Sequence, residues 1–522
     1  MLKKIYMLFK IGRKLSTSGA ISSIYELYKP PLIIKILFSI IGLSFGNKKR
    51  VNDLTPGEKL CSALQEMGTT FIKLGQFLAT RPDIIGENIS KDLEKLQDKL
   101  PAFDLYQAKN ILRNELDKEN FEQIKNISEP IAAASIAQVH FAEIDINNQK
   151  RKVAIKILRP DIEKLFNEEL DALMLLAYII QSFAKKTKRL KLVEIIQLLR
   201  EITNIEMDLR FEAAAANELY ENTKNDIGFE VPKIYWNQTS KKILCLDRIE
   251  GFPIREVEKL KSLNIDTKKL SKNIIQHFLT HAIRDGFFHA DMHQGNLFIS
   301  QDGKIMPVDF GIMGRLDINN RKYLAEILYG FIKRDYKKVA EIHFLAGLVP
   351  KETSRDDFAQ ALRSIGEPIF GQTAKNISGS KLLGQLFEVT EKFNMQTQIQ
   401  LLLLQKTMVV VEGVARKLDP ETNIWDTSRP VLENWLKEIK DPINKTSEIF
   451  NEASEVLKRL PELPKIMDKA NDVMTLIAQG KFNPNTLAYN SLREEELKLE
   501  LIRNKILGGV LVLVILVLIV FK

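Results

Sequence analysis

The spacing of apolar side chains predicts that most of this chain is helical. In one early stretch they recur at steps of four and three residues, which is the spacing of one face of an α-helix. The stretch contains Leu60, Leu64, Met67, Phe71, Leu74 and Leu78. It predicts one amphipathic helix with a separate polar face that carries Lys73 and Gln76. Helices are also predicted over residues 161–224, over 270–284 and over most of the remainder to residue 501.

Strands are predicted where turn-forming residues separate short β-branched or apolar runs. Residues 128–158 contain a small-residue loop and two such runs around Asn147-Asn148, which predicts a β-hairpin. Asp302-Gly303 separates two further short runs and predicts a second hairpin. Residues 234–249 also have strand-like character. Strands and long helices in separate stretches predict an α+β fold.

One apolar run near the C-terminus is a candidate membrane span. Residues 506–521 carry no charge, and basic residues flank them on both sides. This length is at the low edge of the roughly 17 to 25 residues that cross hydrocarbon, and long basic side chains at the ends make up such a shortfall. The alternative is a buried terminal helix, but a helix that is apolar all round needs a complete protein coat. We predict a transmembrane anchor at residues 504–522.

Residues 1–50 form a basic and apolar N-terminal segment. The first residues lack a long apolar core followed by a small-residue cleavage site, so they do not predict a signal peptide. The run at residues 30–45 is apolar but short, and it carries Lys35. Two alternatives stay open for it, a helix at a membrane interface or a helix in a protein core.

Composition narrows the class of protein. A chain of 522 residues predicts one bilobal unit with helical additions, or two to three domains. The formal charge of +9 favours anionic partners. The sequence has no concentrated basic tract with interleaved aromatic residues, so nucleic acid is not an expected partner. The two cysteines, Cys61 and Cys245, form no CxxC pair and indicate a reducing cytoplasmic compartment.

Three short motifs with chemically active side chains lie in order along the chain. Residues 153–156 read VAIK, His289-Ala290-Asp291 is followed by Asn296, and residues 309–311 read DFG. This order and spacing are typical of protein kinases. Lys156 would supply a fixed ammonium for the phosphates of ATP. Asp309 and Asn296 offer the oxygen ligands that Mg²⁺ prefers, and Asp291 would orient or deprotonate a hydroxyl or water.

Two features depart from ordinary protein kinases. The segment expected to cover the nucleotide has alanine where a glycine-rich loop is usual, and alanine keeps a Cβ between the backbone and a ligand. The predicted cofactor-binding residues, besides Lys156, are Ile131, Ala132, Ala133, Ala134, Ser135, Ile136, Ala137, Gln138 and Val139. No APE tripeptide follows Asp309, which argues against a peptide-docking platform.

The histidines raise a metal-site hypothesis. His277 and His281 share a helix face, as metal ligands do, but no HExxH motif accompanies them. We predict structural roles for this pair, and loop-shaping roles for His289 and His293 in the catalytic segment.

Six motifs follow one another along the chain: KLGQ at residues 73–76, AAASIAQVH at 132–140, VAIK, EMDLRFEA at 206–213, HADMHQGN and VDFG. Together they strongly resemble the UbiB family of atypical, protein-kinase-like proteins linked to ubiquinone biosynthesis. The resemblance runs from about residue 53 to 419. It implies that Glu212 pairs with Lys156. It also implies a regulatory set near the nucleotide, made up of Lys73, Gln76, Glu206 and Asp208.

The resemblance further implies a bilobal kinase-like fold with an N-terminal helical extension and a C-terminal membrane segment. The expected divisions are a helical extension at 51–125, a kinase-like core at 126–420 and a helical region at 421–503, before the anchor. It implies a membrane-bound ATP- and Mg²⁺-dependent kinase or ATPase that supports ubiquinone synthesis, with its catalytic domain in the cytoplasm. Members often have two membrane segments, whereas this chain shows one convincing run.

The expected partners are membrane lipids or polyprenyl quinone precursors and other quinone-biosynthesis proteins, and no nucleic acid. Three alternatives stay open at this point: a true protein kinase, a regulatory protein associated with polyprenylphenol hydroxylation, and a lipid-binding pseudokinase. A hydroxylase itself has no support, because neither a flavin-type GxGxxG nor a metal triad is present.

Overall fold

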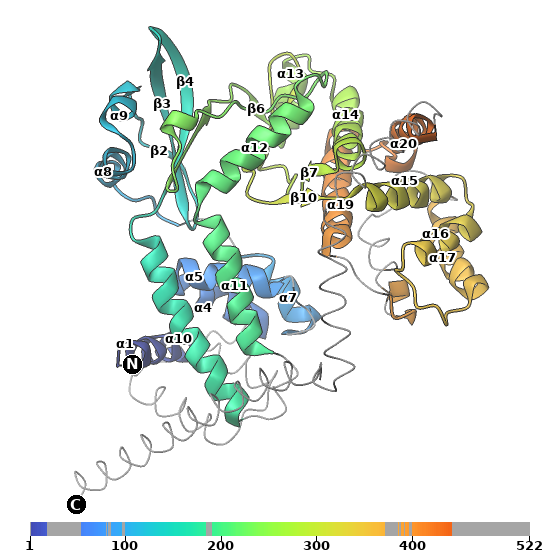
Figure 1. Ribbon diagram of the computed structural model, residues 1–522, viewed down its shortest axis with the longest axis horizontal. Coiled ribbons are helices and arrows are strands. Elements are labelled where there is room, and N and C mark those ends of the chain that lie inside the picture. Colours follow the sequence, from blue (N-terminus) through green and yellow to red (C-terminus); the bar gives the residue numbers. More distant parts are fainter. Residues whose placement is uncertain are drawn as a thin grey trace, which may run out of the picture.

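A computed structural model describes residues 2–17, 54–79, 81, 85–96, 100–183, 191–370, 385, 388–390, 392–395 and 399–440. One part contains an antiparallel sheet flanked by helices, and the other is mostly helical, with two small sheets (Figure 1). The α+β class is confirmed.

The larger sheet has five strands. They are β1 (Ile124–Lys125), β2 (Pro130–Ala133), β3 (Ala137–Ile146), β4 (Gln149–Leu158) and β5 (Ile243–Asp247), in the order β1-β3-β4-β5 with β2 on β3. Asn147 and Asn148, at φ of 52° and 62°, form the tight turn between β3 and β4, so the predicted hairpin is confirmed.

The two faces of this sheet have different neighbours. Alternate side chains such as Val153 and Ile155 pack with Leu112 of helix α8 (Leu105–Glu115), which is followed by α9 (Lys118–Gln123). The side chain of Lys156 points to the opposite face, because successive residues of a strand alternate.

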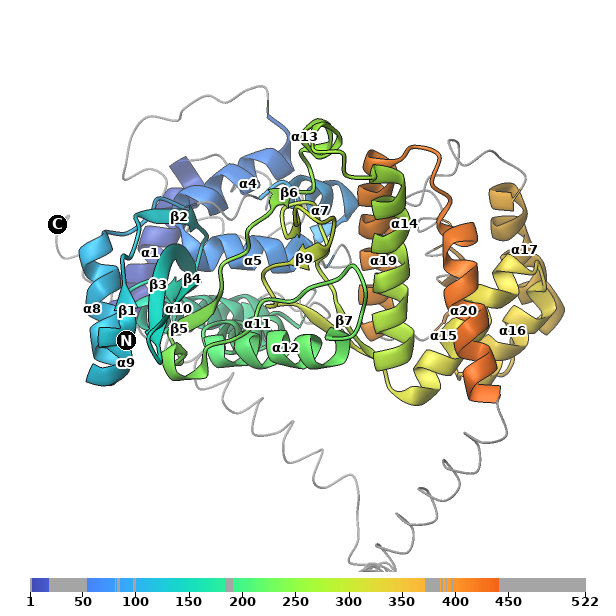
Figure 2. The same ribbon diagram turned by 90° about the horizontal axis from the view of Figure 1, so that it is seen from above.

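Three helices stand between β4 and β5, as the spacing predicts. They are α10 (Ile162–Phe183), α11 (Leu192–Glu206) and α12 (Leu209–Thr223). The predicted strand region 234–249 contains β5, but it begins with a turn of 3-10 helix, Trp236–Gln238. Helix α11 packs beside α10, and α12 runs from the end of α11 toward α14 (Figure 2).

The N-terminal helices pack together beneath the sheet. They are α1 (Leu2–Thr17), α4 (Pro56–Met67), α5 (Thr69–Ala79) and α7 (Glu87–Leu93). The prediction of one continuous helix over residues 60–78 is wrong, because Gly68 at φ 98° ends α4 and starts a new direction. Helix α1 packs against α10 and α4, with Ile11 buried in the core.

The second lobe is built around α14 (Thr267–Thr280), which lies between α19 (Ile399–Leu418) and α20 (Ile424–Lys440) (Figure 2). The buried hydroxyl of Ser271 donates to the carbonyl of Ala415 at 2.7 Å and fixes α14 to α19. The remaining helices are α13 (Val257–Ser262), the π-helical turn η3 (His281–Asp285), α15 (Ile318–Ile332), α16 (Tyr336–Leu345) and α17 (Arg355–Phe370).

Two small antiparallel sheets carry the motifs of this lobe. One joins β6 (Phe252–Pro253), β8 (Leu297–Ile299) and β9 (Ile305–Pro307), and the other joins β7 (Phe287–His289) and β10 (Met313–Arg315). The predicted hairpin around Asp302-Gly303 is confirmed as β8 and β9, with Gly303 at φ 83°.

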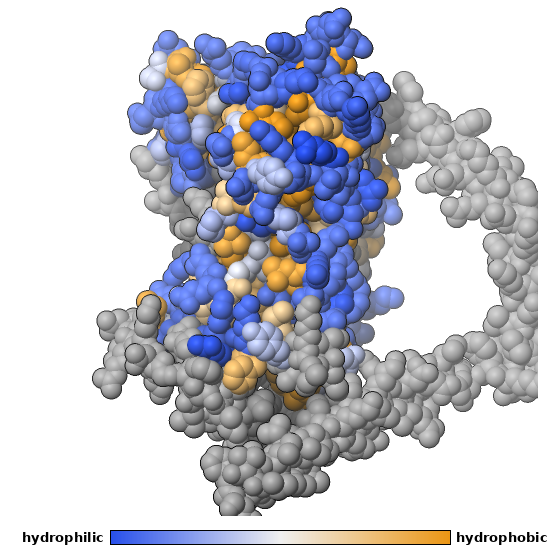
Figure 3. All heavy atoms as spheres, turned by 90° about the vertical axis from the view of Figure 1, so that its left-hand side faces the viewer, coloured by the Kyte–Doolittle hydropathy of each residue, from blue (hydrophilic) through white to orange (hydrophobic). Residues whose placement is uncertain are grey.

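None of the helices within the described ranges is long and apolar enough to cross a membrane. The predicted anchor at 504–522 and the apolar run at 30–45 lie outside the described residues. Figure 3 shows one side of the molecule as largely hydrophilic, with separate hydrophobic patches.

Candidate active site

The centre of the site is an ion pair between the larger sheet and helix α12. Lys156 on β4 donates from Nζ to both carboxylate oxygens of Glu212 on α12, each at 2.9 Å. The two side chains are 17% and 9% exposed. Asp208 caps the start of α12 by accepting from the backbone N–H of Arg210, which fixes where the helix begins. The structure thus brings together the two residues that the resemblance paired.

A second carboxylate shares the same ammonium. Asp309 Oδ1 lies 3.4 Å from Lys156 Nζ, and the Asp309 side chain is 54% exposed. Its backbone has a φ of 63°, in the left-handed region that aspartate tolerates better than most residues. Phe310, the next residue, is buried with its ring 5.7 Å from the ring of His289. Burial of Phe310 holds the polar side chain of Asp309 at the open side.

The charges of Lys156 and Asp309 shift each other's pKa values so that both groups stay ionised. Burial would lower the pKa of Lys156, but the negative charges of Asp309 and Glu212 outweigh it and raise that pKa, so the ammonium stays charged. The same ammonium lowers the pKa of Asp309 to about 2. Burial raises the pKa of the Glu212 carboxyl even beside Lys156. The site therefore presents a fixed cation next to an ionised, solvent-facing carboxylate.

The catalytic loop, residues 289–296, runs from β7 to β8 and is shaped by its own side chains. Asn296 Nδ2 donates to the backbone carbonyl of Asp291 at 3.1 Å and to its Oδ2 at 3.2 Å. The backbone N–H of Asp291 donates to His289 Nδ1 at 3.1 Å, so Nε2 carries the proton and donates to the carbonyl of Val308 at 3.2 Å. His289 thus joins this loop to the strand before Asp309.

Two further contacts hold the catalytic loop. His293 Nδ1 accepts from the backbone N–H of Gly295 at 2.9 Å, so both histidines shape the loop as predicted. From behind, the buried hydroxyl of Thr407 on α19 donates to the carbonyl of Ala290 at 2.8 Å. Asp291 itself stays 41% exposed, open to an incoming group.

Residues 131–139, here called the alanine loop, cover the site from the sheet. They span the end of β2, a three-residue connection and the start of β3. Val139 pairs directly with Lys156 across the strands, so it lies on the same face. Gln138 lies on the opposite face, buried, and it exchanges hydrogen bonds with the backbone of Phe103 at 2.9 and 3.2 Å. Only the backbone of Gln138 is thus available to a nucleotide.

The alanine loop is tied down at its tip. The carbonyl of Ala134 accepts two hydrogen bonds from the Arg159 guanidinium, at 3.1 and 2.8 Å. The hydroxyl of Thr69, at the start of α5, donates to the carbonyl of Ser135 at 3.0 Å in a buried contact. The sequence reasoning missed both anchors, because side chains that bind backbone carbonyls leave no motif.

Helix α5 is also joined to the end of α11 by an ion pair. Lys73 Nζ lies 2.9 Å from Glu206 Oε2, with side-chain exposures of 16% and 25%. Asp208, the other predicted partner, instead forms a fork with Arg210 at 2.7 and 2.9 Å. Gln76 lies one turn further along α5 and is half-buried. Of the predicted regulatory set, the structure joins Lys73 to Glu206.

Comparison with known proteins decides the family. Two family models match the chain, the ABC1 atypical kinase-like domain over residues 95–343 and the UbiB helical domain over 362–423. A relative from Marinobacter nauticus named "Probable protein kinase UbiB" is 37% identical over 448 residues, covering 85% of this chain and 81% of its own. The chain belongs to the UbiB family. The resemblance seen in the sequence is thus confirmed, and with it a kinase-like fold of mixed helices and sheets.

Other UbiB relatives agree. Proteins of the same printed name from Pseudomonas entomophila and Pseudomonas fluorescens are 35% and 33% identical over 461 and 477 residues, covering 87% and 90% of this chain and 84% and 87% of theirs. A solved complex of Rv3197 with erythromycin from Mycobacterium tuberculosis is more distant, with 22% identity, a TM-score of 0.45, and coverage of 72% of this chain and 94% of that one.

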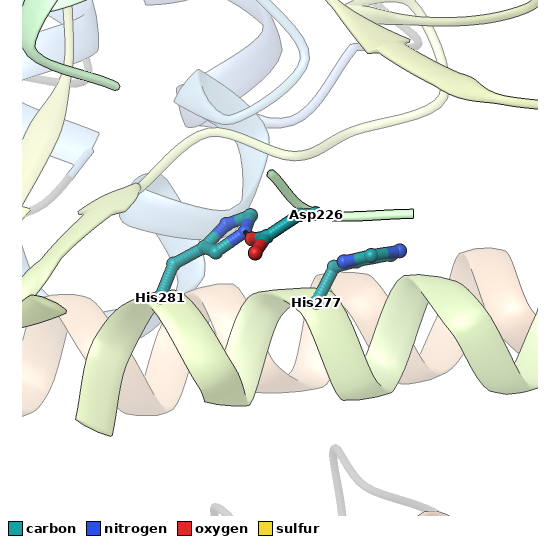
Figure 4. Close-up of side chains that lie close together, drawn as sticks. All are labelled: Asp226, His277 and His281. Atoms are coloured by element: carbon teal, nitrogen blue, oxygen red, sulfur yellow. Dashed lines mark hydrogen bonds and ion pairs between the residues drawn. The ribbon is translucent and has the colours of Figure 1, made fainter. Parts of the chain in front are cut away.

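Away from this UbiB site, one cluster among the described residues resembles a metal site. Ligand atoms of Asp226, His277 and His281 lie within 4.8 Å of one another, with the carboxylate between the two rings (Figure 4). However, Arg284 binds both oxygens of Asp226, at 2.7 and 3.0 Å, and His281 Nε2 lies 3.0 Å from Oδ2. The carboxylate is already neutralised and saturated, which supports the structural roles predicted for both histidines.

The pKa values of this cluster fit that role. Burial works against ionisation of Asp226, but hydrogen bonds from His281 and Arg284 outweigh it and lower the pKa of its carboxyl. Burial lowers the pKa of His277 to about 4, so this ring is neutral at neutral pH. The cluster therefore ties the end of α12 to α14 through one ionised carboxylate.

Proposed function

We propose that this UbiB protein is a Mg²⁺-dependent ATPase or small-molecule kinase that supports ubiquinone biosynthesis. The observation that carries the proposal is the convergence of Glu212 and Asp309 on the ammonium of Lys156. Kinase-like phosphoryl transfer needs such an assembled lysine–glutamate pair beside an ionised metal ligand. A pseudokinase has no need to keep the three groups in register.

Each residue has a role that follows from its position. Lys156 stays protonated and would bind phosphate oxygens of ATP, while Glu212 holds its side chain in place. Asp309 and Asn296 would hold Mg²⁺, which when bound neutralises charge on the phosphates. Their donor set fits this ion, since a carboxylate oxygen and an amide oxygen are hard ligands. Asp291, exposed at the loop, would orient or deprotonate the attacking hydroxyl or water.

The surroundings favour a small acceptor over a peptide. Helix α5 is fixed against the catalytic unit by the Lys73–Glu206 pair and by Thr69, on the side where the alanine loop lies. No APE tripeptide follows Asp309 to build a peptide platform. We therefore expect a lipid-derived precursor or water, and not a protein chain, as the acceptor.

The membrane part of the proposal rests on the sequence. An uncharged run at 506–521 would place the catalytic unit at the cytoplasmic face of a bacterial inner membrane, near polyprenyl quinone precursors and the other proteins of the pathway. A chain ending at Glu500 should then move from the membrane to the soluble fraction. If it stays with membranes after a carbonate wash, the anchor lies elsewhere, and residues 30–45 are tested next by the same fractionation.

The function as a whole is tested in cells that depend on this chain. Replacing the wild-type chain by Asp309→Asn should lower ubiquinone and raise an earlier polyprenylated intermediate, measured by mass spectrometry of lipid extracts at matched protein level. Normal ubiquinone in the variant would refute the proposal. Normal ATP hydrolysis by purified variant with lost ubiquinone would instead favour the lipid-binding alternative.

A further inference from the structure

We propose that Glu218 and Arg315 are positioning residues, and that together they latch α12 to the strand that follows Asp309. The inference rests on the proposed function for its meaning, because α12 carries Glu212, but the contact itself is independent of any ligand. Glu218 lies on α12 and Arg315 ends β10. Neither residue belongs to a motif of the sequence analysis.

The geometry of the pair is that of a fork. Arg315 NH1 donates to Glu218 Oε1 at 2.7 Å, and NH2 donates to Oε2 of the same carboxylate. Two parallel hydrogen bonds between planar groups fix direction as well as distance, which a single lysine contact does not. The hydrogen bonds to Glu218 also raise the pKa of the guanidinium.

Arg315 is itself held from the other side. Its guanidinium lies over the ring of Phe287, 4.4 Å from the centroid, and Arg315 is the strand partner of Phe287 in the β7–β10 pair. One residue earlier, Gly314 leaves no room for a side chain, since a Cβ there would approach the ring of Phe288 to 2.1 Å. Strand β10 is thus held closely against β7, and Arg315 lies in a fixed position from which it can bind α12.

The latch connects both halves of the site. Strand β10 begins two residues after Gly311, and the backbone N–H of Ala290 donates to the carbonyl of Ile312 at 3.0 Å. The segment from Asp309 to Arg315 therefore moves with the catalytic loop. Through Glu218, α12 is bound to this same segment, and the backbone N–H of Phe310 also favours the ionised form of Glu212.

The exposure of the pair separates positioning from stability. The side chains of Arg315 and Glu218 are 65% and 37% exposed. Ion pairs at such sites contribute little to folding stability, so breaking this one should leave the protein folded. In kinases, the orientation of the helix that carries the glutamate is commonly set by a reversible charge, such as a phosphate on the activation segment. In this protein the permanently charged guanidinium of Arg315 would set the orientation of α12.

The test is a charge swap in the full-length chain. Arg315→Glu and Glu218→Arg are each expected to lower kcat for ATP hydrolysis roughly 3- to 30-fold, which lies within the range of coupling between residues in contact. The KM for ATP should change less than kcat, because the phosphate-binding side of the site is untouched. The double swap should recover part of the lost kcat, because it restores the ion pair but not the contact of Arg315 with Phe287, and the melting temperature should change little throughout.

The same helix offers a matched control. Glu221 pairs with Lys224 at 3.0 Å, with both side chains 54% exposed, but this pair joins no other element. Glu221→Arg should leave kcat unchanged. The latch is refuted if Arg315→Glu behaves like this control, or if the swap recovers nothing.

Amide hydrogen exchange decides the latch separately from the proposed function. Exchange within α12, residues 209–223, should rise in Arg315→Glu and return to the wild-type rate in the double swap. If Asp309→Asn leaves ubiquinone normal in cells, the proposed function fails, while this exchange pattern still supports the latch. Unchanged exchange in both single variants refutes the latch whatever the activity.

Discussion

The alanine loop and the catalytic loop are held mainly by different kinds of contact. The alanine loop is fixed through its backbone carbonyls, by Thr69 and Arg159 from outside the loop. The catalytic loop is fixed mainly by its own side chains, since Asn296 and His289 bind the backbone of the same loop, and Thr407 of α19 adds one contact from outside. The tip of the first loop can therefore change in sequence while keeping its position, whereas substitution of Asn296 or His289 removes contacts that hold the second loop.

This difference predicts that substitutions near the catalytic loop have the larger effects on turnover. Asp309→Asn keeps the size of the side chain but removes the charge that would bind Mg²⁺. Turnover should fall roughly 100-fold or more, since an interaction made by the reacting complex is lost. The measurement is ATP hydrolysis with and without Mg²⁺, at matched folded concentration.

The pH dependence sharpens the same test. The pKa of Asp309 is lowered to about 2, below the ordinary value, so the carboxylate is ionised at every pH above about 4. The loss in Asp309→Asn should therefore be constant from pH 5 to 9. A variant with full Mg²⁺-dependent hydrolysis would remove Asp309 from the site.

An intermediate effect is expected where α5 meets the kinase-like unit. Lys73→Ala leaves Glu206 partly buried without its cation, and such a loss is larger than at an open surface. We expect turnover or nucleotide selectivity to change roughly tenfold, which is the effect of about 1.4 kcal/mol. The charge swap Lys73→Glu with Glu206→Lys should recover part of it in a double-mutant cycle. Strictly additive effects would show that α5 does not act on the site.

The smallest effect is expected at the tip of the alanine loop. Thr69→Val removes one hydrogen bond to the carbonyl of Ser135 and should cost about 1 kcal/mol of unfolding free energy. The KM for ATP should rise, while kcat stays near that of the wild type. Thr203→Val is the matched control, because its buried hydroxyl donates to Leu199 within one helix at 2.8 Å. Equal KM values for the two variants would show that the loop needs no such anchor.

The sequence predicts correctly those elements that depend on local residue preferences and apolar spacing. Asn147-Asn148 predicted its hairpin because asparagine tolerates positive φ, and both residues adopt it. The helices of residues 161–224 were readable from apolar spacing. The break at Gly68 was missed because the apolar stripe continues across it, and spacing alone does not register a change of direction.

The motif residues of the candidate site could be predicted from the sequence, but the residues that hold them in position could not. Lys156, Asp291, Asn296 and Asp309 carry recognisable spacing, and the resemblance supplied Glu212. Glu218 and Arg315 are 97 positions apart and share no sequence motif, so their ion pair is seen only in the structure. Gln138 was assigned to cofactor binding together with its neighbours, because the motif alone does not show which residues of a strand lie on the same face as Lys156.

The length of chain between Lys156 and Glu212 bears on how the protein folds. The two are 56 residues apart, and closing a flexible loop of that size would cost considerable entropy. Helices α10 and α11 lie side by side, so the second returns the chain toward the start of the first (Figure 1). Once this helical hairpin has formed from nearby contacts, the search for the ion pair is short. Lengthening both helices by the same number of turns would preserve the meeting point, whereas lengthening one alone would carry Glu212 past its lysine.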